Sequence, residues 1–232
     1  MRGLVPPGAP PERVLAAFGV AGSRPIPLRG GQGTSWQTGD VVLKPALASL
    51  AELDWWAEVS ASVCCHGFRL ARQLRAEGGS AVVAGWCATR FLPGEHVRRR
   101  WPEAIAVGER LHAALRDIQR PDFLDSRRDP WSVGDRVAWG ELPIARFADA
   151  PHLPRLAAAR RRIAAASQLI HGDLGGNVLY HDVLPPAVID FAPYWRPAGF
   201  ATAIVVADAL VWEGATPGSS PRSVTSMTSA ST

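Results

Sequence analysis

The chain has 232 residues, of which 47% are hydrophobic and 20% charged, with a net charge of +4 and a sequence pI near 9.5. This composition is typical of a folded globular protein and excludes a disordered one, and the length suits one domain of two lobes or two small domains. The positive charge is scattered arginine without interleaved aromatic residues, so we expect no nucleic acid among the partners.

Cysteines and apolar runs bound the environment of the protein. Cys64, Cys65 and Cys87 make an odd count and lack metal-ligand spacing, which favours a reducing compartment. The first residues lack the apolar run of a signal peptide, and no stretch approaches the ~18–20 apolar residues of a membrane span. We therefore expect a cytoplasmic protein without a membrane partner. The sequence makes no prediction of the oligomeric state.

Residues 1–91 predict a small sheet with one main helix. Gly39-Asp40 between two short extended runs favours a tight hairpin turn, and Leu47–Val63 has apolar residues at helical spacing. In chain order we expect a short helix (Glu12–Phe18), extended segments (Pro25–Leu28, Trp36–Thr38, Val41–Lys44), the main helix (Leu47–Val63) and strands (Phe68–Leu74, Ala81–Ala84, Trp86–Phe91).

Leu92-Pro93-Gly94 interrupts this pattern and marks a boundary, after which helices dominate residues 92–213. The expected elements are helices at Pro102–Ile118, Pro154–Ala166 and Phe200–Trp212, and a β-like patch at Leu169–Ile170, Val178–Tyr180 and Ala187–Ile189. Residues 120–150 are rich in proline and aspartate and are not assigned. Residues 214–232 are rich in serine and threonine, and we expect them to be disordered.

A glycine-rich stretch and a solitary lysine form the first candidate site. RGGQGTSW, residues 29–36, places Gly30, Gly31 and Gly33 between extended runs, where backbone N–H groups can approach an anion; an ordinary loop is the alternative. Lys44 is the only lysine beside 24 arginines, and it closes the next apolar strand. A compact ammonium suits a place between two phosphates better than a planar guanidinium, so we predict that Lys44 binds nucleotide phosphates; a surface lysine is the alternative.

The stretch LIHGDLGGNVLYHDVLPPAVIDF, residues 169–191, carries the most specific pattern. Asp173 follows a short strand, where it can orient a hydroxyl and accept its proton. Asn177 and Asp190 can supply oxygen ligands for Mg²⁺. The gathering of these polar residues at the ends of short strands predicts a phosphoryl-transfer site.

HGDLGGN followed by IDF resembles the aminoglycoside phosphotransferase and choline-kinase-like family, small-molecule kinases that share the protein-kinase fold. The similarity runs from about Pro25 to Trp212. It implies an α+β, two-lobed fold, with an N-lobe of an antiparallel sheet plus a helix at residues 1–91 and a larger, mostly helical C-lobe at residues 92–213. It also implies an enzyme that uses ATP and Mg²⁺ to phosphorylate a small-molecule hydroxyl.

The resemblance assigns roles to individual residues. Asp173 would be the catalytic base, Asn177 and Asp190 the metal ligands, and Lys44 the phosphate lysine, with His171 supporting the loop. Adenine would lie against the hinge, Thr89–Leu92. That places Thr89 and Phe91 in the nucleotide site.

A helical glutamate should pair with Lys44 in such a site, and two candidates exist. Glu52 and Glu58 lie six residues apart on the predicted helix and therefore on different faces. We prefer Glu52, because Trp55-Trp56 resembles the aromatic packing beyond the paired residue in the family. A solvated charge on the helix surface is the alternative for either residue.

The chain departs from the family pattern in two ways. Four steps separate Asp173 from Asn177, where the family usually has five. Family members usually continue after the Ile-Asp-Phe aspartate with several helices on the substrate side, whereas here only Phe200–Trp212 is expected to be helical after Asp190. The second departure motivates an alternative function, a nucleotide-binding module without turnover. Aminoglycosides and choline are cations and call for a pocket lined by carboxylates, whereas residues 91–170 carry more arginine than acid. The sequence therefore does not predict which molecule accepts the phosphoryl group.

Overall fold

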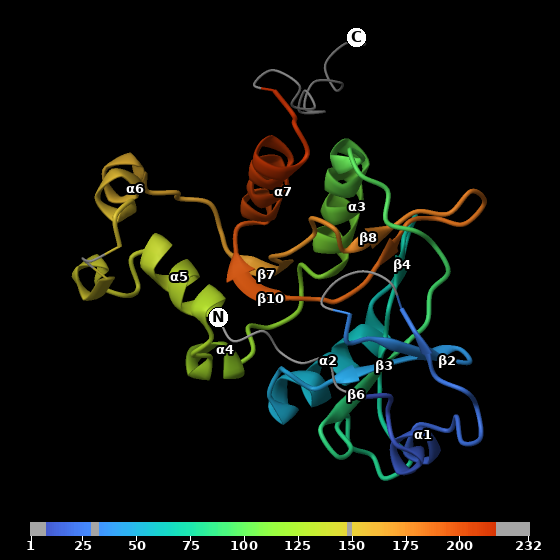
Figure 1. Cartoon of the computed structure of the whole chain (residues 1–232). Coiled ribbons are helices and arrows are strands. Elements are labelled where there is room, and N and C mark those ends of the chain that lie inside the picture. Colours follow the sequence, from blue (N-terminus) through green and yellow to red (C-terminus); the bar gives the residue numbers. More distant parts are fainter. Residues whose placement is uncertain (1–7, 29–32, 148–149, 217–232) are drawn as a thin grey trace.

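The computed structural model describes residues 8–28, 33–147 and 150–216, which form a lobe built on a sheet and a mostly helical lobe (Figure 1). The expected disorder of residues 214–232 falls largely outside these ranges. Within them, no helix combines the length and apolar character needed to cross a membrane.

The sheet is five-stranded and antiparallel, in the order β1-β2-β3-β6-β5. Its strands are β1 (Ile26–Pro27), β2 (Trp36–Thr38), β3 (Val41–Pro45), β5 (Gln73–Leu74) and β6 (Trp86–Arg90). The expected hairpin is present, because Thr38 pairs with Val41 and Gly39 adopts a φ of 58°, which suits glycine at the first turn position.

The strand expected at Ala81–Ala84 does not form. Val83 makes an isolated bridge with Trp86, and the two residues between them, Ala84 and Gly85, have φ values of 49° and 79°. This tight turn uses the residues that the strand would need. It leads the chain directly into β6.

Helices α1 (Glu12–Ala17) and α2 (Leu50–Ser62) complete this lobe. Helix α2 begins three residues later than expected because Ser49 is its N-cap, with the Ser49 Oγ accepting the N–H of Glu52 at 3.2 Å. Ser49-Leu50-Ala51-Glu52 has the spacing of a capping box, a signal that the apolar periodicity concealed.

The helical lobe is organised around α3 and α7, which pack against each other and against β7. Its central elements are α3 (Trp101–Ala114), β7 (Gln168–His171), β8 (Val178–Leu179), β9 (Ala187–Val188), β10 (Pro193–Arg196) and α7 (Ala198–Trp212). Strand β10, which was not expected, pairs antiparallel with β7, while β8 and β9 form a hairpin. The run expected as one strand at Phe68–Leu74 divides in two: β4 (Arg69–Leu70) pairs with β9 and β5 pairs with β6.

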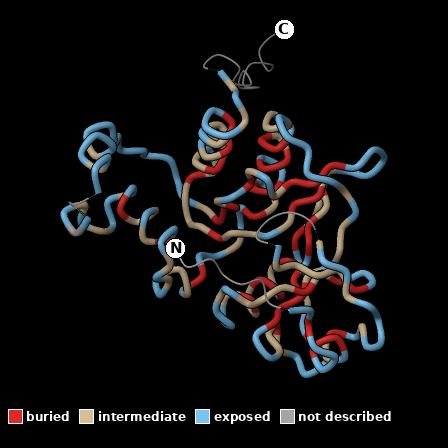
Figure 2. Tube along the Cα trace, in the orientation of Figure 1, coloured by how far each residue is buried: buried red, intermediate tan, exposed pale blue. Residues whose placement is uncertain are grey.

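Two main clusters of buried apolar side chains support the lobes. One joins α1 to β3 and β6 through residues such as Val14 and Leu43, and the other joins α3, β7 and α7 through residues such as Leu111 and Leu169. Figure 2 shows the second cluster as buried stretches on α3, α7 and the strands between them. Trp56 of α2 belongs to this second cluster, so the main helix of the sheet lobe is anchored in the helical lobe.

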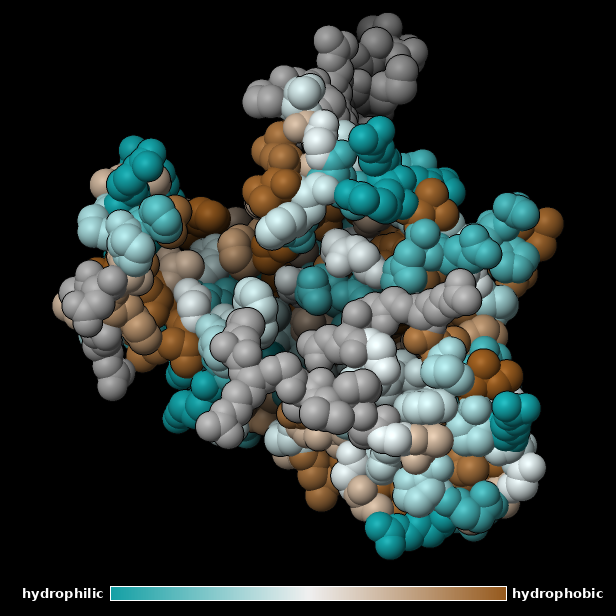
Figure 3. Space-filling view, viewed as in Figure 1, coloured by the Kyte–Doolittle hydropathy of each residue, from teal (hydrophilic) through white to brown (hydrophobic). Residues whose placement is uncertain are grey.

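Short peripheral helices occupy most of the unassigned region, and the helix expected at Pro154–Ala166 follows them. They are α4 (Phe123–Ser126), α5 (Pro130–Ala138), the 3₁₀ helix η1 (Ile144–Phe147) and α6 (Leu153–Ala159). Helix α5 starts with Asp129 as N-cap and Pro130 at the first helical position. Helix α6 ends at Ala159 instead of Ala166, since Arg160 adopts extended backbone and donates to the Val137 carbonyl. Helices α5, η1 and α6 border an apolar groove of about 660 Å³, and Figure 3 shows apolar side chains in this part of the surface.

Candidate active site

The solitary lysine meets the last acidic residue of the motif. Lys44 lies on β3 opposite Cys87 of β6, and its Nζ is 2.5 Å from Oδ1 of Asp190 although 146 residues separate them along the chain. Both side chains are partly exposed, at 27% and 49%. The pair is therefore reachable by a ligand, and both residues line one cavity.

The four-residue spacing from Asp173 to Asn177 gives a compact loop. The Asn177 amide nitrogen donates to the main-chain oxygen of Asp173 at 2.7 Å and to its carboxylate Oδ2 at 3.1 Å. The spacing therefore still brings the candidate base and the candidate metal ligand together.

A buried histidine supports this loop from behind. His171 Nδ1 accepts the N–H of Asp173 at 3.1 Å and that of Ala192 at 3.4 Å, so Nε2 carries the proton and donates to the Ile189 carbonyl at 3.2 Å. Burial lowers the pKa of His171 to about 4, which keeps the ring neutral. These bonds join the segments that carry Asp173 and Asp190, which agrees with the supporting role expected for the histidine.

A close contact with Tyr194 explains the glycine before Asp173. A Cβ at Gly172 would overlap the Tyr194 ring of β10. Glycine at position 172 therefore leaves room for an aromatic side chain.

Phe191 ties the loop to α2. Its ring stacks on that of Trp56, with centroids 3.8 Å apart and planes 9° from parallel. The preceding Asp190 has a φ of 48°, a left-handed conformation that is uncommon outside glycine, aspartate and asparagine. The stack therefore anchors the segment after β9 that carries Asp190.

The two helical glutamates point to different environments. Glu52 lines the same cavity as Lys44, whereas Glu58 is exposed. Burial raises the pKa of Glu52, and the nearby positive charge of Arg127 lowers it in part. In the described structure Lys44 pairs with Asp190, so the pairing of Glu52 with Lys44 stays a prediction.

The candidate residues surround a cavity of about 470 Å³ between β3, β6, α2 and the loop that follows β7, which we call the donor cavity. The polar residues that line it come from both lobes and include Thr34, Ser35, Lys44, Glu52, Gln73, Thr89, Arg127, Asp173, Asn177 and Asp190. Phe91 is not among its lining residues, and its N–H donates to the Asp40 carbonyl at 2.8 Å. Gly30 and Gly31 lie outside the described residues, while Gly33 precedes Thr34 with a φ of 68°.

A second cavity, of about 500 Å³, adjoins the donor cavity, and we call it the acceptor cavity. Its walls come from α5, β10 and α7 and include Trp131, Tyr194, Phe200 and Asp208. Asp173 lines both cavities. Although Asp173 is open to them, partial burial raises its pKa, and the charges of Asp208 and Asp190 add to this effect.

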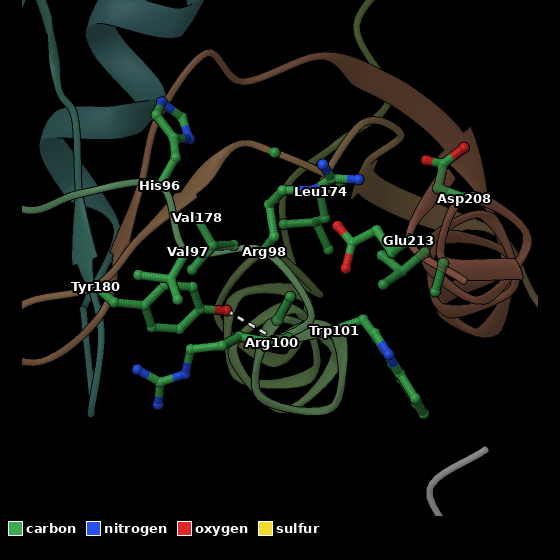
Figure 4. A pocket seen from close by; sticks show the side chains of 15 residues that line it. His96, Val97, Arg98, Arg100, Trp101, Leu174, Val178, Tyr180, Asp208 and Glu213 are labelled. Atoms are coloured by element: carbon green, nitrogen blue, oxygen red, sulfur yellow. Dashed lines mark hydrogen bonds between the residues drawn. The ribbon is translucent and has the colours of Figure 1, made fainter. Parts of the chain in front are cut away.

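A smaller cavity of about 90 Å³ lies between α3, α7 and the loop, and Figure 4 shows its side chains. The Tyr180 hydroxyl donates to the Arg100 carbonyl at 3.0 Å on one side. On the other, Glu213 accepts the Arg99 N–H at 2.7 Å. Neither Lys44 nor Asp173 lines this cavity, and its contacts fasten the end of α7 to the segment before α3.

Comparison with solved structures shows what fold these cavities belong to. Amicoumacin kinase hAmiN, solved with AMP-PNP, Ca²⁺ and Ami, superposes with a TM-score of 0.59 at 18% identity, over 88% of this chain and 69% of that one. An aminoglycoside phosphotransferase from Alicyclobacillus acidocaldarius gives 0.54 at 15% identity, over 88% and 73%. A thermostable mutant of aminoglycoside phosphotransferase APH(4)-Ia, with ADP and hygromycin B, gives 0.51 at 16% identity, over 86% and 77%.

These similarities confirm the two-lobed, kinase-like α+β fold, and fold and family together define the chain as a phosphotransferase of the small-molecule kinase type. The sequence profile of the phosphotransferase enzyme family matches residues 31–194. The chain therefore belongs to this family, as the resemblance predicted. No curated protein matches it.

Proposed function

We propose that the protein transfers the γ-phosphoryl group of ATP to a hydroxyl group of a small molecule. The observation that carries this proposal is the convergence of Lys44, Asp173, Asn177 and Asp190 on one cavity. Two of the solved neighbours were captured with AMP-PNP or ADP, which supports a nucleotide as the donor.

Asp173 is the proposed base of the reaction. The acceptor oxygen attacks the γ-phosphorus, and the hydroxyl proton passes to the Asp173 carboxylate. The bond between the γ-phosphorus and the β–γ bridging oxygen breaks, and ADP leaves with the electron pair of that bond. A raised pKa suits this role, because a carboxylate that binds a proton more tightly accepts it more readily from the attacking hydroxyl.

Asn177 and Asp190 are the proposed metal ligands. Since the Asn177 nitrogen is bonded to Asp173, its amide oxygen is left to bind a cation, and Asp190 has a second carboxylate oxygen besides the one on Lys44. Within the described ranges no three histidine, cysteine or acidic side chains make a metal site by themselves. In a nucleotide complex, phosphate oxygens would add to the ligands from Asn177 and Asp190. Mg²⁺ held here would neutralise charge on the phosphates.

The other residues of the donor cavity are given roles according to their positions in it. Lys44 would bind the α- and β-phosphates, with Gly33 in the segment that covers them and Thr89 beside the adenine. When Asp190 binds the metal, Glu52 is the carboxylate in the same cavity that can pair with Lys44.

The acceptor cavity suits a small molecule with a flat or apolar face. Trp131, Tyr194 and Phe200 supply aromatic surface, and Asp208 supplies a carboxylate near Asp173. This chemistry fits a ring-bearing hydroxyl compound better than a small polar one.

The proposal is tested by incubating the protein with Mg-ATP and a metabolite extract and searching by mass spectrometry for compounds that gain one phosphoryl group. Asp173→Asn serves as the control and should yield no such product. A thermal shift with Mg-ATP but no phosphorylated product in any extract would instead identify a nucleotide-binding module.

A further inference from the structure

One cationic side chain lies where the two cavities meet. Arg127, in the loop between α4 and α5, lines the donor cavity and the acceptor cavity, as do Asp173 and Ala192. Among the described residues that line either cavity, Lys44 and Arg127 are the cations. Lys44 is paired with Asp190, which leaves Arg127 as the cation that lines both cavities together with the candidate base.

The protein holds the Arg127 side chain in a defined place. Its Nε donates to Oδ2 of Asp129 at 3.1 Å, its Nη1 donates to the Pro193 carbonyl at 2.9 Å, and its guanidinium lies 5.2 Å over the Tyr194 ring. The side chain is 18% exposed. Asp129 is itself fixed, because Oδ1 accepts the Ser132 N–H at 2.9 Å at the start of α5.

These contacts leave bonding capacity unused. A guanidinium carries five N–H groups, and within the described part of the chain two of them are committed, to Asp129 and Pro193. The pairing with Asp129 is local and does not reach into either cavity. A positioned, partly desolvated guanidinium with free donors is the arrangement that stabilises charge on a transferring phosphoryl group.

We propose that Arg127 binds the γ-phosphoryl group as it passes from the donor cavity to the acceptor cavity, and so stabilises the transition state. This inference rests on the proposed function and adds a catalytic residue to it. The oxygens of the phosphoryl group would accept N–H bonds from Arg127 while the acceptor oxygen bonds to phosphorus and ADP departs. Arg127 neither gains nor loses a proton in this step.

A purely structural role is the competing interpretation, because Arg127 also ties α5 to β10. Its neighbour Arg128 offers a matched control. Arg128 is exposed, donates to the Asp125 and Arg127 carbonyls, and lines neither cavity. A structural arginine would affect every ligand alike, whereas a transition-state arginine discriminates between ligands.

The experiment compares the affinity of each variant for Mg-ADP with aluminium fluoride, which imitates the transferring group, and for Mg-AMP-PNP. Arg127→Ala should weaken the fluoroaluminate complex by about 100-fold or more and AMP-PNP binding by about fivefold or less. Arg127→Lys, which keeps the stem and charge, should recover part of the loss, and Arg128→Ala should match the wild type.

Each other outcome is decisive. Equal losses for both ligands, or no loss for either, would overturn the role of Arg127. A wild-type protein that binds AMP-PNP but gains nothing from fluoroaluminate would also overturn it. A wild-type protein that binds no nucleotide at all would overturn the proposed function itself.

Discussion

The donor and acceptor cavities share Asp173 but are bordered by different structural elements. The donor cavity is bordered by paired strands, one capped helix and the loop after β7, and its candidate phosphate and metal residues, Lys44, Asn177 and Asp190, belong to motifs. The acceptor cavity is bordered by α5, β10 and α7, and its aromatic residues belong to no motif. This difference indicates that the residues proposed to bind phosphate and metal can be predicted from motif spacing, whereas the residues proposed to bind the acceptor are brought together by the packing of separate elements.

The largest expected effect concerns the residue that both cavities share. Asp173→Asn removes the proton acceptor but keeps the shape of the side chain, so turnover should fall by about 1,000-fold. Affinity for Mg-ATP should change little, because Asp173 lies at the edge of the donor cavity. Steady-state kinetics and calorimetry measure the two effects. Turnover equal to that of the wild type would remove Asp173 from the mechanism.

The next largest effect concerns His112 and His171, the buried histidines behind the loop that borders both cavities, and acid titration measures it. Burial holds the pKa of His112 and of His171 at about 4, below the usual 6.5, and the neutral His112 Nε2 accepts the His171 N–H at 3.1 Å. Between pH 6.5 and about 4 these histidines bind protons in the unfolded chain but not in the folded chain, so the free energy of unfolding decreases as the pH is lowered through this window. The loss is of the order of 3 kcal/mol for each histidine.

Urea unfolding at a series of pH values measures this slope. His112→Gln should flatten it by roughly half, since one of the two coupled groups is gone. An unaltered slope in His112→Gln would contradict the account of these two side chains.

A smaller effect tests the wall between the loop and the acceptor cavity. Gly172→Ala forces a methyl group into the Tyr194 ring, and overpacking of this kind costs about 1–3 kcal/mol of unfolding free energy. Gly199→Ala is the control, because no neighbouring atom lies within 4 Å of its Cβ position in α7, and it should be neutral or slightly stabilising. Thermal denaturation compares them, and equal stability would show that the Tyr194 contact is unimportant.

The smallest effect should separate the two cavities. Trp131 is 78% exposed, so Trp131→Ala should barely change stability, while loss of its ring should raise the acceptor KM by about tenfold or less. Nucleotide affinity should stay the same. Trp212→Ala, 73% exposed and outside both cavities, should change neither quantity. A Trp131 variant that loses ATP affinity would show that the cavities do not act separately.

Much of the donor cavity could be predicted from the sequence because its signals are local. Lys44 closes a strand behind a hairpin, and the residues from Asp173 to Asp190 lie within one short loop and hairpin. Their convergence on one cavity is what the motif spacing implied. Phe91 is a limit of this reasoning, since the register of β6 with its neighbours directs the Phe91 N–H to Asp40 instead.

The acceptor cavity and Arg127 could not be predicted in the same way. Nothing in the sequence distinguishes Arg127 from Arg128, and only the packing of α5 against β10 turns one inward and leaves the other in solvent. Strand β10 depends on pairing with β7, more than twenty residues earlier, which no local pattern shows. Asp129-Pro130 was a readable signal for the start of α5, because this pair suits the N-cap and first helical positions.

The central claim is that the lysine of β3 and the aspartate after β9 hold one magnesium-bound nucleotide, and calorimetric titration with Mg-ATP tests it most directly. The wild type should bind a single nucleotide in a Mg²⁺-dependent manner. Asp190→Ala should abolish this binding and Lys44→Ala should weaken it at least about tenfold. Asp40→Ala, at the exposed hairpin turn, should leave it intact. Unchanged affinity in both cavity variants would contradict the account.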